Sequence, residues 1–204
     1  MRVVGLTGSI GMGKSTTAQM ARQMGYPVHD ADAGIHALLG PGGAAVDPVG
    51  KRFPASLSGD RIDRKQLGQE VFQNPKALKE LEAILHPLVG ALKQRFLRQA
   101  ALRRARLVIL DVPLLFETRG DRICDGVVVV SASAMIQRQR VLARPAMTTD
   151  KLRGILARQT PDTEKRRRAD WVVLTGLGHR TARLALKKAL RQAQNRPHRR
   201  RKRG

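Results

Sequence analysis

The chain has 204 residues, enough for one sizeable α/β core with an insertion but too few for two large domains. Its hydrophobic content of 42% excludes wholesale disorder, and its aromatic content of 3% requires an aliphatic core. A net charge of +23 indicates a polyanionic partner, either a nucleic acid or a phosphate-rich small molecule. No stretch approaches the roughly 20 apolar residues of a membrane span, and the single Cys124 cannot form an intramolecular disulfide. We therefore expect a cytoplasmic protein.

Residues 8–15 read Gly-Ser-Ile-Gly-Met-Gly-Lys-Ser, the G-x-x-x-x-G-K-[ST] pattern of a phosphate-binding loop. The apolar residues 2–6 in front predict a buried strand, which leaves no room for a signal peptide, and residues 14–24 behind predict a helix. A chance glycine-rich turn is the alternative, but a strand before and a helix after it favour the functional interpretation. The pattern therefore predicts a nucleoside triphosphate site.

The residue types of this loop suit the chemistry of phosphate binding. Its glycines permit left-handed backbone and let amide groups approach phosphate oxygens, while the next helix directs its N-terminus at the same anion. Lys14 is expected to reach the β- and γ-phosphates, and the Ser15 hydroxyl is expected to bind Mg²⁺. The predicted ATP-binding residues of this segment are Gly8, Gly11, Met12, Gly13, Lys14, Ser15 and Thr16.

A second strand is predicted at residues 26–29, and it ends in Asp30-Ala31-Asp32. Open α/β sheets bind ligands at the carboxyl ends of their strands. A carboxylate at this edge is therefore a candidate base or hydroxyl-orienting group, and we favour Asp32 over Asp30 for that role. The alternative is an Asp that caps the next helix, expected at residues 33–39.

Residues 40–61 contain several Gly and Pro with weak periodicity, and we expect an irregular excursion there. Helical patterns follow, with a capping box at Asp63 and Gln66 and an Asn74-Pro75 helix start. We expect the helix that starts there to end at Leu85, because His86-Pro87 interrupts the pattern before a long helix from Leu88 to about Arg103. This helical block is a candidate substrate-binding insertion, and His86 is either a substrate ligand or a structural histidine.

The apolar run at residues 107–112 predicts a buried strand that delivers Asp111 to the same edge of the sheet. Nucleoside-triphosphate-binding proteins of this kind use such an acid to hold Mg²⁺, directly or through water. A loop over residues 113–117 is expected to follow, and then a fourth strand at residues 126–130. Asp111 is therefore a predicted metal ligand together with Ser15.

Two arginine-rich helices separated by a proline are predicted next, at residues 134–143 and 151–159. Their place between the fourth strand and a fifth, at residues 169–174, favours a mobile lid that closes over phosphates. A solvated basic face is the alternative. A final helix is predicted at residues 180–194, and the tail beyond Asn195, with six basic residues and no acid, is expected to be disordered.

The ordered set of motifs resembles the dephospho-CoA kinase family. The matches are LTGSIGMGKST, HDAD, HPLV, DVPLLFE, the Arg/Gln-rich lid and a closing strand that begins Ala-Asp, and they span roughly residues 3 to 190. The resemblance implies ATP-dependent, Mg²⁺-assisted phosphorylation of the ribose 3′-hydroxyl of dephospho-CoA, which gives coenzyme A. It also implies that Asp32 is the catalytic base and that Arg140 and Arg144 meet the ATP phosphates. Leu174-Thr175 departs from the Asp-Asn pair that is commoner in the family.

The predicted fold is therefore an α/β P-loop kinase of three layers, with a five-stranded parallel sheet, a helical insertion and a lid. The nucleotide-binding core is expected to comprise residues 1–39, 105–133 and 169–194. The expected coenzyme-A-binding insertion is 40–104, the lid 134–168 and the basic tail 195–204.

Two rival functions share parts of this pattern. Another small-molecule P-loop kinase would have the same core with a different insertion. A nucleic-acid-binding NTPase would explain the charge, and the tail could contact nucleic acid without sequence preference. The scarcity of aromatic side chains argues against a single-strand binder, because such proteins stack bases on aromatic rings.

Overall fold

The computed structural model describes residues 1–72 and 74–196. The chain forms two compact units, which we call the sheet unit and the helical unit. The sheet unit comprises Met1–His29 and the chain from Ala100 onward, and the helical unit comprises Asp30–Gln99.

A five-stranded parallel sheet forms the centre of the sheet unit, as predicted, with the strand order β2-β5-β1-β6-β7. β1 pairs with β5 on one side and with β6 on the other. The strand order is therefore built outward in both directions from β1. Such a switch point opens a crevice at the carboxyl end of the central strand. The strands are β1 Arg2–Thr7, β2 Val28–Asp30, β5 Leu107–Asp111, β6 Gly126–Ser131 and β7 Trp171–Leu174.

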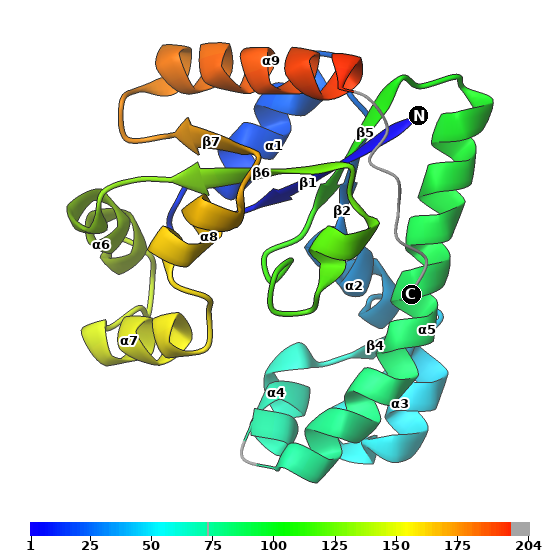
Figure 1. Ribbon diagram of the computed structural model, residues 1–204. Coiled ribbons are helices and arrows are strands. Elements are labelled where there is room, and N and C mark those ends of the chain that lie inside the picture. Colours follow the sequence, from blue (N-terminus) through cyan, green and yellow to red (C-terminus); the bar gives the residue numbers. More distant parts are fainter. Residues whose placement is uncertain (73, 197–204) are drawn as a thin grey trace. The chain divides into compact units, whose positions relative to one another are not determined.

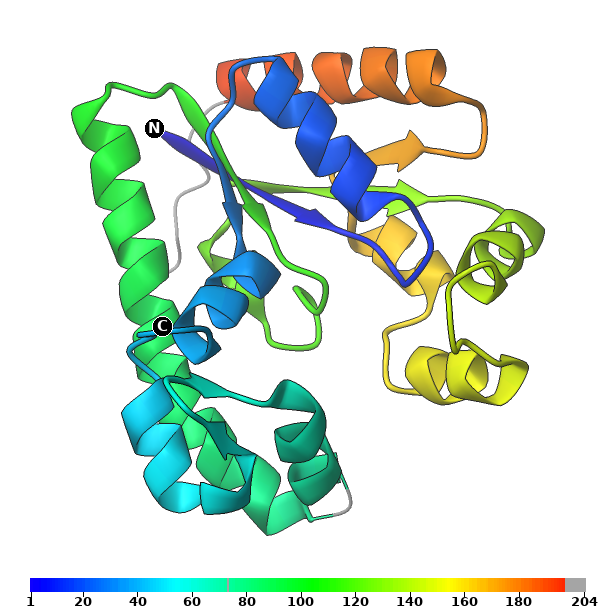
Figure 2. The same ribbon diagram turned by 180° about the vertical axis from the view of Figure 1, so that it is seen from behind.

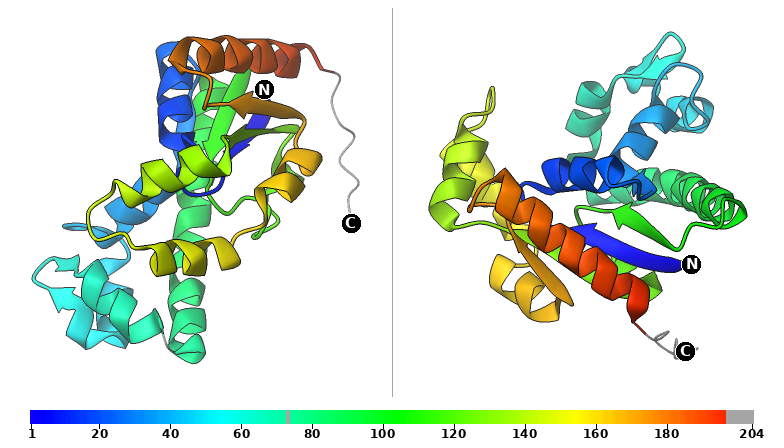
Figure 3. Two further views of the ribbon diagram at one scale, coloured as in Figure 1. Left: turned by 90° about the vertical axis from the view of Figure 1, so that its left-hand side faces the viewer. Right: turned by 90° about the horizontal axis from the view of Figure 1, so that it is seen from above.

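Two helices cover one face of this sheet, α1 (Lys14–Gln23) and α9 (His179–Asn195). They lie beside each other over the strands (Figures 2 and 3). Their small residues, such as Ala18 and Ala189, let them approach the aliphatic strand residues closely. This aliphatic core agrees with the low aromatic content of the chain.

The opposite face is covered by the loop that follows β5 and by α8 (Asp162–Arg168), a helix that the sequence analysis missed. Gly5 of β1 permits this packing, because a Cβ there would lie 2.6 Å from Leu115 Cδ2 and 3.0 Å from Cys124 Sγ. The helices α1 and α9, the sheet, and the loop after β5 together with α8 make up the three predicted layers (Figure 1).

The expected lid contains α6 (Ala134–Leu142) and α7 (Thr149–Ala157). Each helix has a side-chain N-cap: Ser133 Oγ accepts a hydrogen bond from Ile136 N, and Thr148 Oγ1 accepts one from Lys151 N. Thr148 therefore caps α7, which begins at Thr149, two residues earlier than expected.

The helical unit has its own aliphatic core around Val49, Phe53 and Leu67. The prediction of an irregular excursion at residues 40–61 is wrong, because α3 and a two-stranded hairpin form there (Figure 1). Pro48 is tolerated in the first turn of α3, where backbone amides have no partner within the helix. Gly59, with φ 61°, provides the tight hairpin turn. The elements are α2 Ala31–Leu39, α3 Val46–Arg52, η1 Pro54–Ser56, β3 Leu57–Ser58, β4 Arg61–Ile62, α4 Arg64–Phe72 and α5 Pro75–Leu102.

The predicted break at His86-Pro87 is also wrong, because α5 runs through Pro87 without interruption. An interior proline costs about 3 kcal/mol through a lost hydrogen bond and a steric clash. Apolar residues on both sides of Pro87, including Leu81 and Leu92, pack against the core of the helical unit and offset this cost. The predicted start of the helix is confirmed, since Asn74 Oδ1 accepts hydrogen bonds from Lys76 N and Ala77 N, both at 3.1 Å.

The C-terminal part of the chain is ordered further than predicted. Asn195 ends α9, and Arg196 forms an ion pair with Asp170 and lies with its guanidinium 5.3 Å from the centre of the Trp171 ring. Asp170 also accepts a hydrogen bond at 2.9 Å from Val127 N at the start of β6. The rest of the predicted disordered tail, residues 197–204, lies outside the described residues.

Candidate active site

The predicted phosphate-binding loop connects β1 to α1 at the switch point of the sheet. Its glycines are needed for two different reasons. Gly13 is the N-cap of α1 with φ 87°, a left-handed conformation that favours glycine. Gly8 packs against β6 so closely that a Cβ would lie 2.3 Å from Val130 Cγ2 and 2.8 Å from the Val130 carbonyl oxygen. Gly13, the N-cap of α1, has no side chain to accept a hydrogen bond from the first amides of the helix, so these amides are available to an anion.

Lys14 and Asp111 meet at this loop, as the sequence analysis requires of a site that holds both phosphate and metal. Lys14 Nζ lies 2.7 Å from Asp111 Oδ1. Asp111 ends β5, is only 1% exposed and pairs in register with Leu6 of β1. Ser15 and Thr16 follow Lys14 in the first turn of α1 and are exposed. A cation and a buried carboxylate thus lie in contact, and two exposed hydroxyl residues follow the lysine in sequence.

The two arms of the expected lid hold one residue of the phosphate-binding loop, Ile10. Gln137 of α6 donates a hydrogen bond from Nε2 to the Ile10 carbonyl oxygen at 2.8 Å. Gln159, just after α7, accepts one from Ile10 N at 3.1 Å. The sequence analysis did not single out either glutamine, because neither lies near the loop in sequence.

Arg140 lies against the phosphate-binding loop and the end of β7. Its Nη1 donates to Thr175 Oγ1 at 2.9 Å, and its Nη2 donates to the Thr175 carbonyl oxygen at 2.9 Å. Thr175 Oγ1 in turn donates to the Met12 carbonyl oxygen at 2.8 Å. Thr175, which differs from the commoner family residue, therefore contacts both the loop and a predicted phosphate-binding arginine. Arg144, just after the end of α6, is exposed.

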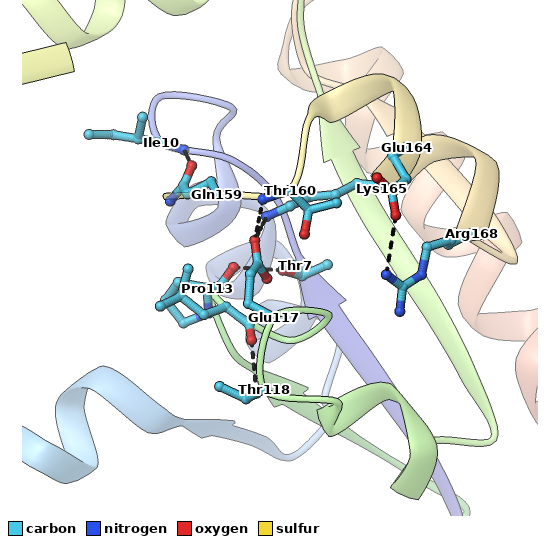
Figure 4. Close-up of polar contacts among 11 residues, drawn as sticks. Thr7, Ile10, Pro113, Glu117, Thr118, Gln159, Thr160, Glu164, Lys165 and Arg168 are labelled. Atoms are coloured by element: carbon cyan, nitrogen blue, oxygen red, sulfur yellow. Dashed lines mark hydrogen bonds and ion pairs between the residues drawn. The ribbon is translucent and has the colours of Figure 1, made fainter. Parts of the chain in front are cut away.

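A further acid, Glu117, lies in the loop that follows β5 (Figure 4). Its Oε1 accepts a hydrogen bond from Thr160 N at 2.7 Å and lies 3.0 Å from Lys165 Nζ of α8. Burial by itself raises the pKa of Glu117, but the amides of Thr160 and of Glu117 itself, together with Lys165, outweigh burial and lower the pKa below its ordinary value of 4.5. Glu117 is therefore ionised at neutral pH.

The remaining candidates belong to the helical unit. Asp30 is the N-cap of α2, and its Oδ1 accepts a hydrogen bond from Ala33 N at 3.0 Å. α2 begins at Ala31, earlier than expected, so Asp32 lies in its first turn, where it is exposed. His86 is exposed in the middle of α5. Of the two acids Asp30 and Asp32, it is therefore Asp30 that caps the helix, the role given above as the alternative to catalysis.

Among the described residues there is no cluster of three or more His, Cys, Asp or Glu side chains suited to a metal ion. The same part of the chain has no helix with the length and apolarity needed to span a membrane. A parallel sheet with a phosphate-binding loop at its switch point, a lysine and a carboxylate beside it, and an arginine on the following helices defines a P-loop kinase.

Comparisons with known proteins identify the family. The dephospho-CoA kinase family profile matches residues 2–177. A dephospho-CoA kinase of Rhodospirillum rubrum is 57% identical over 194 residues, which cover 95% of this chain and 92% of the relative. One of Bradyrhizobium diazoefficiens is 48% identical over 200 residues, covering 98% of this chain and all of the relative.

Solved structures agree in fold. A crystal structure of a Thermus thermophilus protein has a TM-score of 0.80 and 36% identity, covering 93% of this chain and 95% of that one. The dephospho-CoA kinase of Campylobacter jejuni has a TM-score of 0.64 and 23% identity, covering 94% and 97%. The chain belongs to the dephospho-CoA kinase family, and its activity is the ATP-dependent phosphorylation of dephospho-CoA in coenzyme A synthesis. The predicted family and activity are confirmed.

Proposed function

We propose that the phosphate-binding loop, Lys14 and the N-terminus of α1 bind the β- and γ-phosphates of ATP. The observation that carries this proposal is the Lys14–Asp111 contact of 2.7 Å beside the open amides of α1. Phosphoryl transfer asks for positioning and charge neutralisation rather than covalent catalysis. Lys14 supplies a positive charge toward the β–γ bridge, and Gly8, Gly11, Met12, Gly13 and Thr16 belong to the same binding loop and helix start.

The residues present fit a magnesium ion. Mg²⁺ binds oxygen ligands, takes one or two carboxylates or hydroxyls from the protein, and completes its shell with water and phosphate oxygens. Asp111, a buried carboxylate at a strand end, and Ser15, an exposed hydroxyl, match this donor set without a larger acidic cluster. When bound, the ion would neutralise charge that develops on the phosphates.

Asp32 is the proposed catalytic base, which accepts a hydrogen bond from the 3′-hydroxyl and aligns it for in-line attack. The cap at Asp30 supports this choice, because it assigns the neighbouring acid to helix stability. His86 is proposed to bind the substrate from α5, and residues 40–104 are proposed as the coenzyme-A-binding part.

Residues 134–168 are proposed as a lid that brings arginines to the ATP phosphates. Arg140 already touches the loop, since its Nη1 lies 3.4 Å from the Gly11 carbonyl oxygen. Arg144 is exposed on the same arm and is proposed as a second phosphate ligand. The hydrogen bonds of Gln137 and Gln159 to Ile10 support a functional link between this segment and the nucleotide.

The basic tail is proposed to contact nucleic acid without sequence preference, in addition to the kinase reaction. α9, which leads into the tail, has no acidic residue and carries exposed Arg183, Lys187, Lys188 and Arg191. This charge would neutralise backbone phosphates of a polymer. The single cysteine of the sequence, Cys124, suits the proposed cytoplasmic location.

One assay tests the proposed reaction. Purified protein is incubated with ATP, Mg²⁺ and dephospho-CoA, and coenzyme A is detected by mass. We expect product only when all three are present, and none with shikimate or gluconate as acceptor. Failure to form coenzyme A would contradict the proposal, and so would full activity after removal of divalent cations.

A further inference from the structure

Glu117 and Lys165 form an ion pair beside the returning part of the proposed lid, which leads back to the sheet (Figure 4). The Lys165 side chain has no exposed surface, and that of Glu117 is 17% exposed. Their polar atoms lie 3.0 Å apart, although not in line for a hydrogen bond. A buried ammonium group loses several kcal/mol of hydration free energy. Solubility, which accounts for many exposed charged residues, therefore does not account for this buried pair.

The same Glu117 oxygen also holds the backbone of the returning segment. Thr160 N donates to Glu117 Oε1 at 2.7 Å. The residue before Thr160 is Gln159, whose Oε1 accepts the hydrogen bond from Ile10 N at 3.1 Å. Figure 4 shows these residues converging from the loop after β5, the returning segment and the phosphate-binding loop. Polar contacts, joined by the peptide bond between Gln159 and Thr160, thus link Lys165 to the phosphate-binding loop.

We propose that Glu117, held by Lys165, is a positioning residue that seats Gln159 on Ile10 and so preforms the phosphate-binding loop for ATP. The proposal rests on the proposed binding of ATP phosphates at this loop. A loop fixed before ATP arrives loses less conformational freedom on binding, and its affinity is correspondingly higher.

The geometry favours positioning over simple stabilisation. Replacement of a buried ion pair by an apolar pair of similar volume is often neutral or stabilising, so the packing of α8 alone does not require this pair. An apolar pair would not provide an acceptor for Thr160 N. The ionised carboxylate does, and charge-assisted hydrogen bonds are shorter and stronger than neutral ones.

Two matched double variants test this acceptor function without leaving a buried unpaired charge. Both carry Lys165→Met. One adds Glu117→Gln, which keeps an oxygen for Thr160 N, and the other adds Glu117→Met, which has a similar size and no such oxygen. Calorimetric titration with ATP and Mg²⁺, in the absence of dephospho-CoA, measures affinity directly. Hydrogen exchange of the Ile10 amide measures the Gln159 contact independently of ATP.

We expect Lys165→Met/Glu117→Gln to bind ATP within about threefold of the original chain, and Lys165→Met/Glu117→Met to bind about tenfold more weakly, the effect of about one lost hydrogen bond. Ile10 should exchange faster only in the second variant. Adding Gln159→Ala to the second variant should weaken binding little further, because both changes break the same chain of contacts.

Equal ATP affinities and equal Ile10 exchange in the two double variants would overturn the proposal. It would also be overturned if the losses of ATP affinity caused by Gln159→Ala and by Glu117→Met multiplied when the two changes were combined. Thermal melts of both variants show whether each is folded. Glu164→Gln, beside Lys165 and in an ion pair with Arg168 on the same helix, is the surface control and should leave ATP affinity unchanged. An original chain that binds no ATP would instead contradict the proposed function, while the exchange of Ile10 would still test the contact.

Discussion

Replacing Lys14 with methionine tests the centre of the site, because it removes the charge and keeps the length of the side chain. In the structure Lys14 Nζ lies 2.7 Å from the buried Asp111 Oδ1, and the lysine side chain is 14% exposed. Hydrogen bonds to charged groups contribute about 1.5–3 kcal/mol. Partial exposure of Lys14 places the expected loss of unfolding free energy near the lower end, at about 1.5–2 kcal/mol.

This loss corresponds to a fall in Tm of about 3–8 °C for a chain of this size. The effect on catalysis should be much larger. A charge positioned for the transition state contributes a factor of about 10²–10³ to kcat, so Lys14→Met should lower kcat by at least that amount. The variant should therefore stay folded and lose nearly all turnover.

Coenzyme A formation, followed by mass at saturating ATP, and a circular dichroism melt give the two quantities. Lys187→Met, the same substitution at an exposed position of α9, is the control and should change neither. A kcat within tenfold of the original chain would refute the assignment of Lys14 to the phosphates. An unchanged Tm would show that the contact with Asp111 contributes nothing to stability.

Three further predictions concern the acids and the tail. Asp32→Asn should lower kcat by about two decades and leave KM for ATP unchanged, since the base acts on the acceptor hydroxyl. Asp30→Asn should change kcat by no more than about threefold, because asparagine also caps helices well. If Asp30→Asn lowered kcat more than Asp32→Asn, the assignment of the base to Asp32 would be wrong. The folded-state pKa of Glu117 is lowered, so its stabilisation is present above pH 4.5 and is lost as the pH falls through the folded-state pKa. Urea unfolding should therefore show a difference between the original chain and Lys165→Met/Glu117→Gln that changes between pH 3 and 7, and a constant difference would contradict the reasoning. Truncation after Arg196 keeps the ion pair between Arg196 and Asp170. It should leave kcat and KM for dephospho-CoA within about twofold of the original chain, while the retention of RNA at low salt weakens. A tenfold rise in KM for dephospho-CoA would place the tail in the active site.

The features predicted well from the sequence are those encoded by neighbouring residues. The strand, loop and helix around residues 8–15 and the Asn74 cap each depend on a few adjacent residues, and the structure contains both. The juxtaposition of Lys14 with Asp111 could also be expected, because parallel strands bring their carboxyl ends to one edge.

The features that were missed depend on packing between distant parts of the chain. Local sequence rules predict a helix break at Pro87 and an irregular stretch around Pro48. Both prolines nevertheless lie within helices, because these helices bury apolar residues against one core. Glu117 and Gln159 had no local signal, because their partners lie 43 to 149 residues away in sequence.

The two hydrogen bonds of Ile10 have a consequence for how the kinase works. Gln137 holds its carbonyl from the outgoing arm of the proposed lid, and Gln159 holds its amide from the returning arm. A movement of either arm therefore strains the backbone of the loop that binds phosphate, since Ile10 cannot keep both bonds while the arms separate. Closure of the lid and binding of the nucleotide phosphates would then be thermodynamically linked, and ATP would favour whichever arrangement of the arms keeps the loop in its binding shape.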